Sequence, residues 1–166
     1  MDTTVNLALP MLAPGQSQKE SYHNEALVIA DFMICGAIVE DVVRNTPPAS
    51  PVAGQCWIVG AAPTGAFVSH IGHVAGYTAG GWRFVAPVDG MAMTCPSSGV
   101  ILTRRNAQWE RGIARCLEMR VDDKRVVGPR QPAIAYPTGG TGADSVARAS
   151  IGLIIDALRA HGLIDP

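Results

Sequence analysis

His73-Val-Ala-Gly-Tyr-Thr-Ala-Gly-Gly-Trp82-Arg-Phe-Val85 is the stretch that decides the fold. An alternating run leads into a glycine-bearing turn and resumes at a tryptophan, which is the pattern of a β-hairpin. Val100-Ile-Leu-Thr-Arg-Arg-Asn-Ala-Gln-Trp109-Glu-Arg111 repeats this plan, with Arg105-Asn106 at the turn. The third tryptophan, Trp57, opens another strand, Cys56–Val59. We therefore expect residues 54–112 to form an antiparallel β-domain with a barrel-like or sandwich-like arrangement.

The composition indicates a protein that is poor in charge. Of the 166 residues, 48% are hydrophobic and 16% are charged, whereas about 25% charged residues is usual for a soluble domain. One interpretation is that part of the surface is buried against other chains. The alternative is that the 18 glycines and 12 prolines raise the apolar share without any interface. The net charge of −1 excludes a broad basic surface, so we expect no nucleic-acid partner.

Cysteine and histidine spacing gives no pattern of a cofactor or metal site. The four cysteines, at positions 35, 56, 95 and 116, include no C-x-x-C pair. Because Cys35 lies in a helical pattern and Cys56 and Cys95 in apolar strands, we expect buried free thiols. His70 and His73 lack a third ligand nearby in the sequence, while a zinc site needs three or four. We therefore expect no metal and no cofactor. We also expect no membrane insertion, because no apolar run approaches the roughly 20 residues that a membrane helix needs.

An arm and a helix are predicted before the β-domain. Asn6–Pro14 is apolar and carries two prolines, so it should be extended and should pack on its own chain or on a neighbouring subunit. Residues 16–43 have helical periodicity. His23 and Glu25 could be read as an acid and a base, but helix-start polarity explains them better, because no nucleophile accompanies them.

A second helix is predicted at residues 143–161, after the glycine-rich hinge 137–142. It is apolar nearly all round, so it must cover the β-domain or bundle with copies of itself. We favour a three-helix bundle in a homotrimer. The candidate oligomer interface consists of apolar residues from both helices: Tyr22, Ala26, Ile29, Met33, Val146, Leu153, Ile154, Ala157 and Leu158.

These elements give an α+β fold in three segments. Residues 1–45 form the arm and N-terminal helix for docking or bundling, 46–127 the antiparallel β-domain, and 128–166 the Gly/Pro-rich hinge and C-terminal helix.

The ordered motifs resemble a known family. They begin with Leu7–Lys19 and continue through Pro47–Pro51, Gly54–Val59, Gly80–Phe84 and the Trp109 hairpin. Over residues 5–112 the chain is similar to a family of unknown function in alphaproteobacterial phages and gene transfer agents. Its members occur in tail-fibre and spike proteins. The resemblance implies a virion structural protein, made in the host cytoplasm and assembled with other virion proteins.

Two function classes follow. The first is a phage tail-fibre or tail-tip component for host attachment, with a capsid head spike as an alternative position. The second is a module that binds envelope polysaccharide through Tyr77, Trp82 and Trp109, since aromatic rings stack on sugars; each ring is more often a core residue. We expect no enzyme activity. The carboxylates that glycoside hydrolysis would need share no motif: Asp89, Glu110, Glu118, Asp122 and Asp123.

Overall fold

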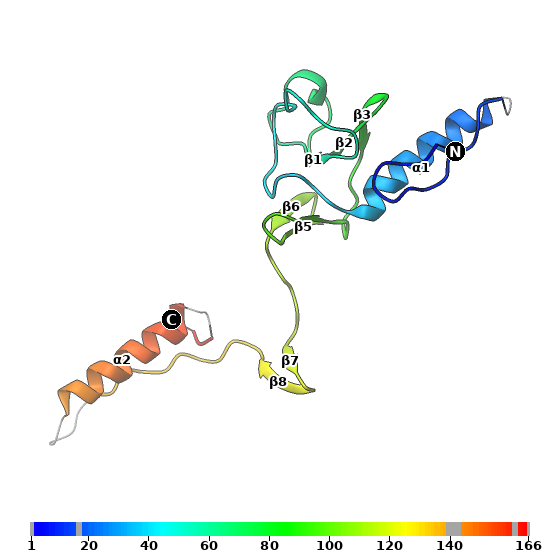
Figure 1. The fold of residues 1–166 in the computed structure, drawn as a ribbon. Helices are drawn as coiled ribbons and strands as arrows, with labels where there is room; N and C mark the ends of the chain where they lie inside the picture. The colour runs from blue at the N-terminus through cyan, green and yellow to red at the C-terminus, as the bar shows by residue number, and fades with distance from the viewer. Residues whose placement is uncertain (1, 16–17, 139–143, 161–162, 166) are drawn as a thin grey trace. The chain divides into compact units, whose positions relative to one another are not determined.

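The protein consists of two compact units, Met1–Ile113 and Ala114–Pro166, in a computed structural model that describes residues 2–15, 18–138, 144–160 and 163–165 (Figure 1). Helices and small antiparallel sheets make this an α+β fold, as predicted. The two units do not coincide with the three segments expected from the sequence. Each unit is described here by itself.

The first unit combines one helix with two three-stranded sheets. Helix α1 spans Lys19–Cys35. One sheet has the order β1-β2-β3, and the other has the order β4-β5-β6. All pairs are antiparallel, and the described strands close no barrel. The strand bounds are β1 Cys56–Ile58, β2 Val74–Thr78, β3 Gly81–Val85, β4 Ala92–Cys95, β5 Val100–Arg105 and β6 Gln108–Arg111, and the short helix η1 spans Gly65–Phe67.

Both predicted hairpins are confirmed. Strands β2 and β3 pair with Tyr77 opposite Trp82. Strands β5 and β6 pair with Arg105 opposite Gln108, so the turn is Asn106-Ala107, one residue later than predicted. Both turn residues have positive φ, 47° and 58°, as a two-residue turn of type I′ requires.

The N-terminal helix is shorter than predicted. It ends at Cys35 because Gly36 adopts the left-handed conformation, with φ 61°, and its N–H caps Phe32 O. Residues 36–46, predicted in large part as the last turns of the helix, instead form an extended segment that we call the strap. Its β-branched residues suit an extended backbone better than a helix.

The strap joins the outer strands of the two sheets. At its start, Ile38 N donates to Thr94 O on β4 at 2.9 Å. Further along, Arg44 N donates to Ile58 O on β1 at 2.8 Å, and Gly60 N donates to Arg44 O at 2.8 Å. One chain segment thereby covers an edge of each sheet.

The helix, the strap and both sheets share one core. Its fully buried side chains come from all four: Phe32, Ile38, Cys56, Ile58, Val74, Met93, Cys95 and Leu102. The other face of the β1-β2-β3 sheet buries Val59, Phe67 and Ala75 in a second cluster. Both faces of this sheet are therefore covered, which explains why β1 is buried at every residue.

The second unit contains a hairpin, an extended segment and a helix. Strands β7 (Met119–Val121) and β8 (Lys124–Val127) pair around Asp122 and Asp123, which both have positive φ. Helix α2 spans Ser145–Ala160. Asp144 caps it, because its Oδ1 accepts hydrogen bonds from the N–H groups of Val146 and Ala147, both at 3.0 Å. The central part of the predicted hinge, residues 139–142, and the predicted helix end at His161 and Gly162 lie outside the described residues.

The contact between α1 and β2 leads to a first prediction, for Gly76→Ala. A Cβ at this position would lie 2.7 Å from Cε1 of Phe32, so the helix must shift or the ring must leave its rotamer. We expect the free energy of unfolding, measured by urea titration, to fall by about 1–3 kcal/mol.

Gly80→Ala is the matched control, because its added Cβ comes close only to the end of the flexible Arg83 side chain, at 3.2 Å, and makes an ordinary contact with Thr78 Oγ1 at 3.7 Å. Adding Phe32→Leu to Gly76→Ala should cost less than the two single changes summed. Equal stability of the two glycine variants would contradict the prediction.

Candidate functional site

A buried carboxylate on α1 holds the N-terminal arm. Asp31 is 3% exposed. It accepts hydrogen bonds from Thr4 Oγ1 at 2.7 Å, from Asn6 N at 2.9 Å and from Leu7 N at 2.7 Å. Burial raises the pKa of Asp31, but the hydrogen bonds from Thr4, Asn6 and Leu7 together outweigh it and leave the pKa below its ordinary value. The carboxylate is therefore ionised at neutral pH and has its donors in place.

A second side chain of α1 captures the arm further along. The Asn24 amide accepts from Leu12 N at 2.9 Å and donates to Leu12 O at 3.0 Å. Within the arm, Thr3 pairs with Pro10 in an isolated antiparallel bridge. Of the two partners considered for this apolar arm, the structure shows the chain's own helix (Figure 1).

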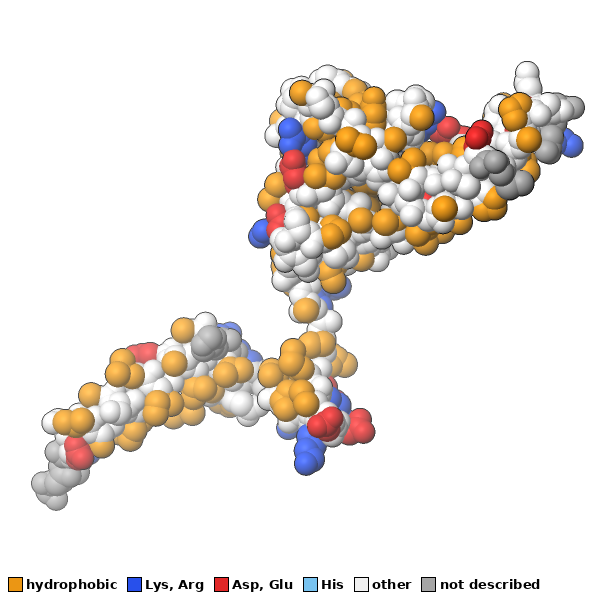
Figure 2. Space-filling view, viewed as in Figure 1, with side chains coloured by type: hydrophobic (Ala, Val, Ile, Leu, Met, Phe, Trp, Pro, Cys, Tyr) orange, Lys and Arg blue, Asp and Glu red, His pale blue; other side chains and the backbone are white. Residues whose placement is uncertain are grey.

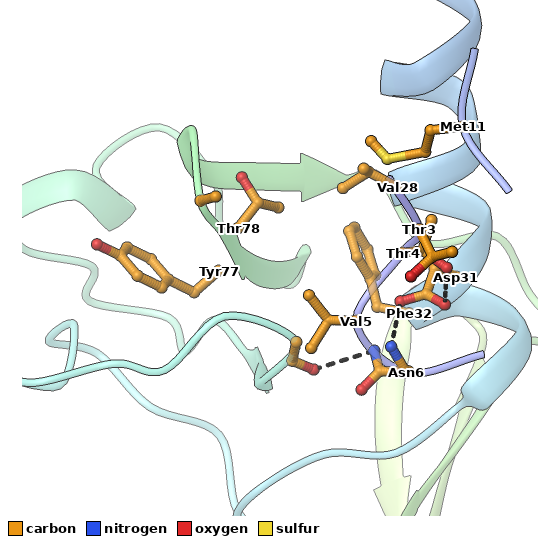
Figure 3. A pocket seen from close by; sticks show the side chains of 12 residues that line it. Thr3, Thr4, Val5, Asn6, Met11, Val28, Asp31, Phe32, Tyr77 and Thr78 are labelled. Carbon is orange, nitrogen blue, oxygen red and sulfur yellow. Dashed lines mark hydrogen bonds between the residues drawn. The ribbon is translucent and has the colours of Figure 1, made fainter. Parts of the chain in front are cut away.

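Between the arm and β2 lies a small pocket of about 110 Å³ (Figure 3). Val5 and Asp31 line it on the side of the arm and α1, and Tyr77 and Thr78 line the opposite wall. Thr78 Oγ1 already donates to Gly81 O at 2.8 Å, and the Asp31 carboxylate is held by the arm. The pocket is thus mainly apolar, with its strongest polar group already engaged.

Two of the three aromatic residues predicted to contact a glycan lie together. The rings of Tyr77 and Trp82 are 5.0 Å apart between centroids and nearly perpendicular, at 65°. Trp82 also packs edge-to-face against Phe67 at 5.0 Å and against Trp57 at 5.5 Å. Trp82 is thus half-buried at the border of the second cluster. Its ring packs against the second cluster, and Tyr77 contacts the same ring.

Trp109 has a different environment. Its indole Nε1 donates to Gly72 O at 2.8 Å, and its ring packs against the shared core. Arg104 lies over the same ring, with its guanidinium carbon 5.9 Å from the centroid. Trp109 therefore links the β4-β5-β6 sheet to the loop before β2, and no described contact joins its ring to Trp82 or Tyr77.

Three of the acidic residues considered for hydrolysis, Asp89, Asp122 and Asp123, lie at or hold turns. Asp89 accepts from the N–H groups of Asn106 and Ala107, at 2.8 and 3.2 Å, and so holds the β5–β6 turn. Asp122 and Asp123 form the β7–β8 turn. Glu25, weighed with His23 as an acid–base pair, forms an ion pair with Arg83 of β3. Among the described residues, no three His, Cys, Asp or Glu side chains gather where they could hold a metal.

The cysteines are free among the described residues, as expected. Cys56 and Cys95 are buried, as predicted. The prediction of a buried thiol is wrong for Cys35, which is the last residue of α1 and is exposed, as is Cys116. Burial raises the pKa of the Cys56 thiol to about 12, with a smaller contribution from nearby Cys35. Cys56 therefore stays protonated and serves as a core side chain. Within the described part of the chain, no helix has the length and apolar character needed to cross a membrane.

The predicted oligomer interface divides between the two helices. On α1, Ile29 and Met33 pack against the chain's own core, while Tyr22 and Ala26 face solvent. On α2, Val146, Leu153, Ile154 and Ala157 are exposed, and Leu158 is half-buried. Among the predicted interface residues, the exposed aliphatic side chains therefore lie mainly on α2.

Asp31 is the important residue that the sequence analysis missed. It stands in the apolar run Val28-Ile-Ala-Asp31-Phe-Met-Ile34. A single carboxylate in such a run can be recognised in the sequence as a candidate buried group, because a buried charge needs hydrogen-bond donors around it. Its partners lie about 25 residues away in the sequence, at Thr4, Asn6 and Leu7, and local spacing does not identify them.

Residues 23–110 match the family described as Protein of unknown function (DUF2793). The match covers more than half of the chain, which therefore belongs to this family. It lies entirely within the first unit, and residues 114–166 fall outside it. A search of curated proteins found no match.

The arm contact leads to a second prediction, for Asp31→Asn. The variant keeps the shape of the side chain, but it loses the charge that three donors face and turns an NH₂ group toward them. We expect the free energy of unfolding at pH 7 to fall by about 2–4 kcal/mol. Asp2→Asn, at an exposed carboxylate of the same arm, is the control and should change little.

The pH dependence has a definite sign. Because the pKa of Asp31 is lowered in the folded state, its contribution is complete above the unfolded value of about 3.9 and is lost as the pH falls through the folded-state pKa. The stability gap between the wild type and Asp31→Asn should stay constant from pH 7 to pH 5 and shrink below about pH 4. A gap that shrank between pH 7 and pH 5 would contradict this assignment.

Proposed function

We propose that this member of the DUF2793 family is a phage virion structural protein. It would act as a homotrimeric tail-fibre or tail-tip component in host attachment, with a capsid head spike as the alternative position. In this proposal the first unit is the displayed module and the second unit is the assembly module. The proposal includes no catalytic role, no cofactor and no nucleic acid.

The observation that carries the proposal is the lack of a sufficient core in the second unit. Ile155 and Ile164 are its only buried hydrophobic side chains among the described residues. Leu117 is 96% exposed, and both strands of the β7–β8 hairpin are exposed throughout. An isolated two-stranded hairpin is marginally stable in water, and an exposed apolar surface of this extent marks an association site.

The first unit supports the display role. It has a continuous core and a covered sheet, and its arm is tied to its own helix. It satisfies its polar groups internally at Asp31, Asn24 and Asp89. Such a unit can be presented to solvent without a partner. The resemblance to virion surface proteins supports placing it in host attachment.

Glycan binding is the second candidate mechanism within this role. Tyr77 and Trp82 form a half-exposed aromatic pair beside the pocket that Tyr77 lines. In such a pair, the face of the Tyr77 ring is the proposed contact for a sugar. Trp109 contributes less to this proposal, because its indole is bound to Gly72 O.

A third prediction tests the division of labour between the units. Light scattering of the purified full chain should give three times the chain mass of 17.4 kDa. A truncated chain of residues 1–113 should be a folded monomer with a cooperative thermal transition, because the shared core lies within it. A monomeric full chain, or a trimeric truncated chain, would contradict the assignment of assembly to the second unit.

A fourth prediction tests glycan contact at Tyr77. In a titration of labelled protein against host-envelope polysaccharides, Tyr77→Ala should weaken binding by up to about tenfold, since a well-placed aromatic ring contact contributes on the order of 0.5–1.5 kcal/mol. Tyr77→Phe keeps the ring and should bind like the wild type. Trp82→Ala is a poor test, because Trp82 packs against Trp57 and Phe67. Unchanged binding by Tyr77→Ala would exclude this contact.

A further inference from the structure

The N-terminal arm, residues 2–15, is held on α1 by two polar side chains, which we call the latches. Asp31 accepts three hydrogen bonds from the turn of the arm, and Asn24 pairs with both backbone groups of Leu12. The latches stand two turns of helix apart, so they lie on the same face of α1. The contact of the arm with the helix thus depends on hydrogen bonds at two points.

The arm is a small folded body with hydrogen bonds of its own. Thr4 N donates to Leu9 O at 3.0 Å, and Met11 N donates to Asp2 O at 2.9 Å. Thr4 is the one buried residue among the described residues of the arm, and Val5 is 63% exposed. Hydrophobic side chains are visible on the surface over the region of the arm and α1 (Figure 2). Removing the arm from α1 would therefore cost hydrogen bonds more than buried apolar area.

The arm forms one wall of the pocket that Tyr77 lines. Val5 and Met11 line this pocket from the arm, and Val28 and Phe32 line it from α1 (Figure 3). With the arm in place, the space is a pocket of about 110 Å³. With the arm moved away, the apolar side chains of α1 and the ring of Tyr77 would border an open groove. The arm thus limits what can reach this side of Tyr77.

The two ends of the arm differ in how tightly they are packed. A Cβ at Gly54, in the loop before β1, would lie 2.8 Å from Cγ1 of Val5 and 2.9 Å from Oδ1 of Asn6. A Cβ at Gly15 would meet nothing within 4 Å, and Gly15 N donates to Glu20 Oε1 of α1 at 3.3 Å. Gly15 can therefore act as a pivot that stays with the helix while the residues before it move.

We propose that the arm is a lid that opens as one unit about Gly15 and uncovers the groove between α1 and β2. Both latches release together because the internal hydrogen bonds of the arm keep it a single body. Segments with few buried apolar contacts open locally before the fold as a whole unfolds. The lid lies outside residues 23–110 that match the family. It is a property of the first unit alone, so it stands whether or not the chain forms a trimer or Tyr77 binds a glycan.

The first test is hydrogen exchange of the full chain, followed by NMR at several urea concentrations below the unfolding transition. The amides of Asn6, Leu7 and Leu12, each bonded to a latch, should share one opening constant. This constant should hardly change with urea, because lid opening exposes little surface compared with unfolding. The amide of Val59, bonded to His73 O at 2.9 Å, should exchange at least about 100-fold more slowly and respond strongly to urea.

The second test, Gly54→Ala, pushes the arm away without changing a latch. Opening relieves the collision of the added Cβ with Val5 and Asn6, so the three latch-bonded amides should all exchange faster by one factor of about ten or more. Gly90→Ala is the matched control, because its φ is 95° against 92° at Gly54 and its Cβ meets nothing within 4 Å. It should leave arm exchange unchanged. Anilinonaphthalene sulfonate, a dye that binds apolar surface, should fluoresce more with Gly54→Ala than with Gly90→Ala.

Three results would overturn the lid. Arm amides that exchange only together with Val59 would show that the arm is a fixed part of the fold. Acceleration of Asn6 and Leu7 without Leu12 would show that the arm frays in pieces. Equal dye fluorescence of the two glycine variants would show that no groove is uncovered.

Discussion

The close approach of Phe32 to Gly76 is the constraint on which the first unit depends. Only glycine leaves room for the ring, since a Cβ at position 76 would lie within 3 Å of three ring atoms. This contact fixes the end of α1 over β2. The strap begins four residues later at Gly36, so the same contact decides where the strap meets β4 and β1. Both sheets then close on one core because a single segment spans their edges.

Asp31, one residue before Phe32, adds a second constraint at the same turn of α1. Burying a carboxylate costs several kcal/mol unless donors surround it. Here three donors offset that cost and lower the pKa. The ion pair between Arg83 and Glu25 also joins α1 to the sheet, but both side chains are about a third exposed or more. Pairs of this kind contribute little. The helix position thus depends on Phe32 and Asp31 far more than on surface charge.

The hairpins could be predicted because their determinants are local. Alternation, the Ala79-Gly80 turn and Asn106 are visible in a short window. The end of α1 could not be predicted in the same way. Ile38, Val39, Val42 and Val43 continue an apolar pattern that fits a buried helix, and only the hydrogen bonds of Ile38 with Thr94 and of Arg44 with Ile58 reveal a strand-like strap. Contacts between segments that are distant in the sequence determine where α1 ends and the strap begins. The same holds for the arm, whose partner Asp31 is visible as an anomaly, while its donors are not.

The two units differ in how far they bury their apolar side chains. In the first, the arm, the helix and the sheets share buried contacts, and the two tryptophans that suggested a binding platform take part in packing: Trp82 is half-buried and Trp109 is anchored to Gly72. In the second, Arg159 and Arg148 of α2 donate hydrogen bonds to the backbone of Ile134 and Pro137, and the apolar side of the helix is exposed. Leaving the apolar side chains of α2 in water would cost free energy. An apolar helix face is stabilised when it is removed from water.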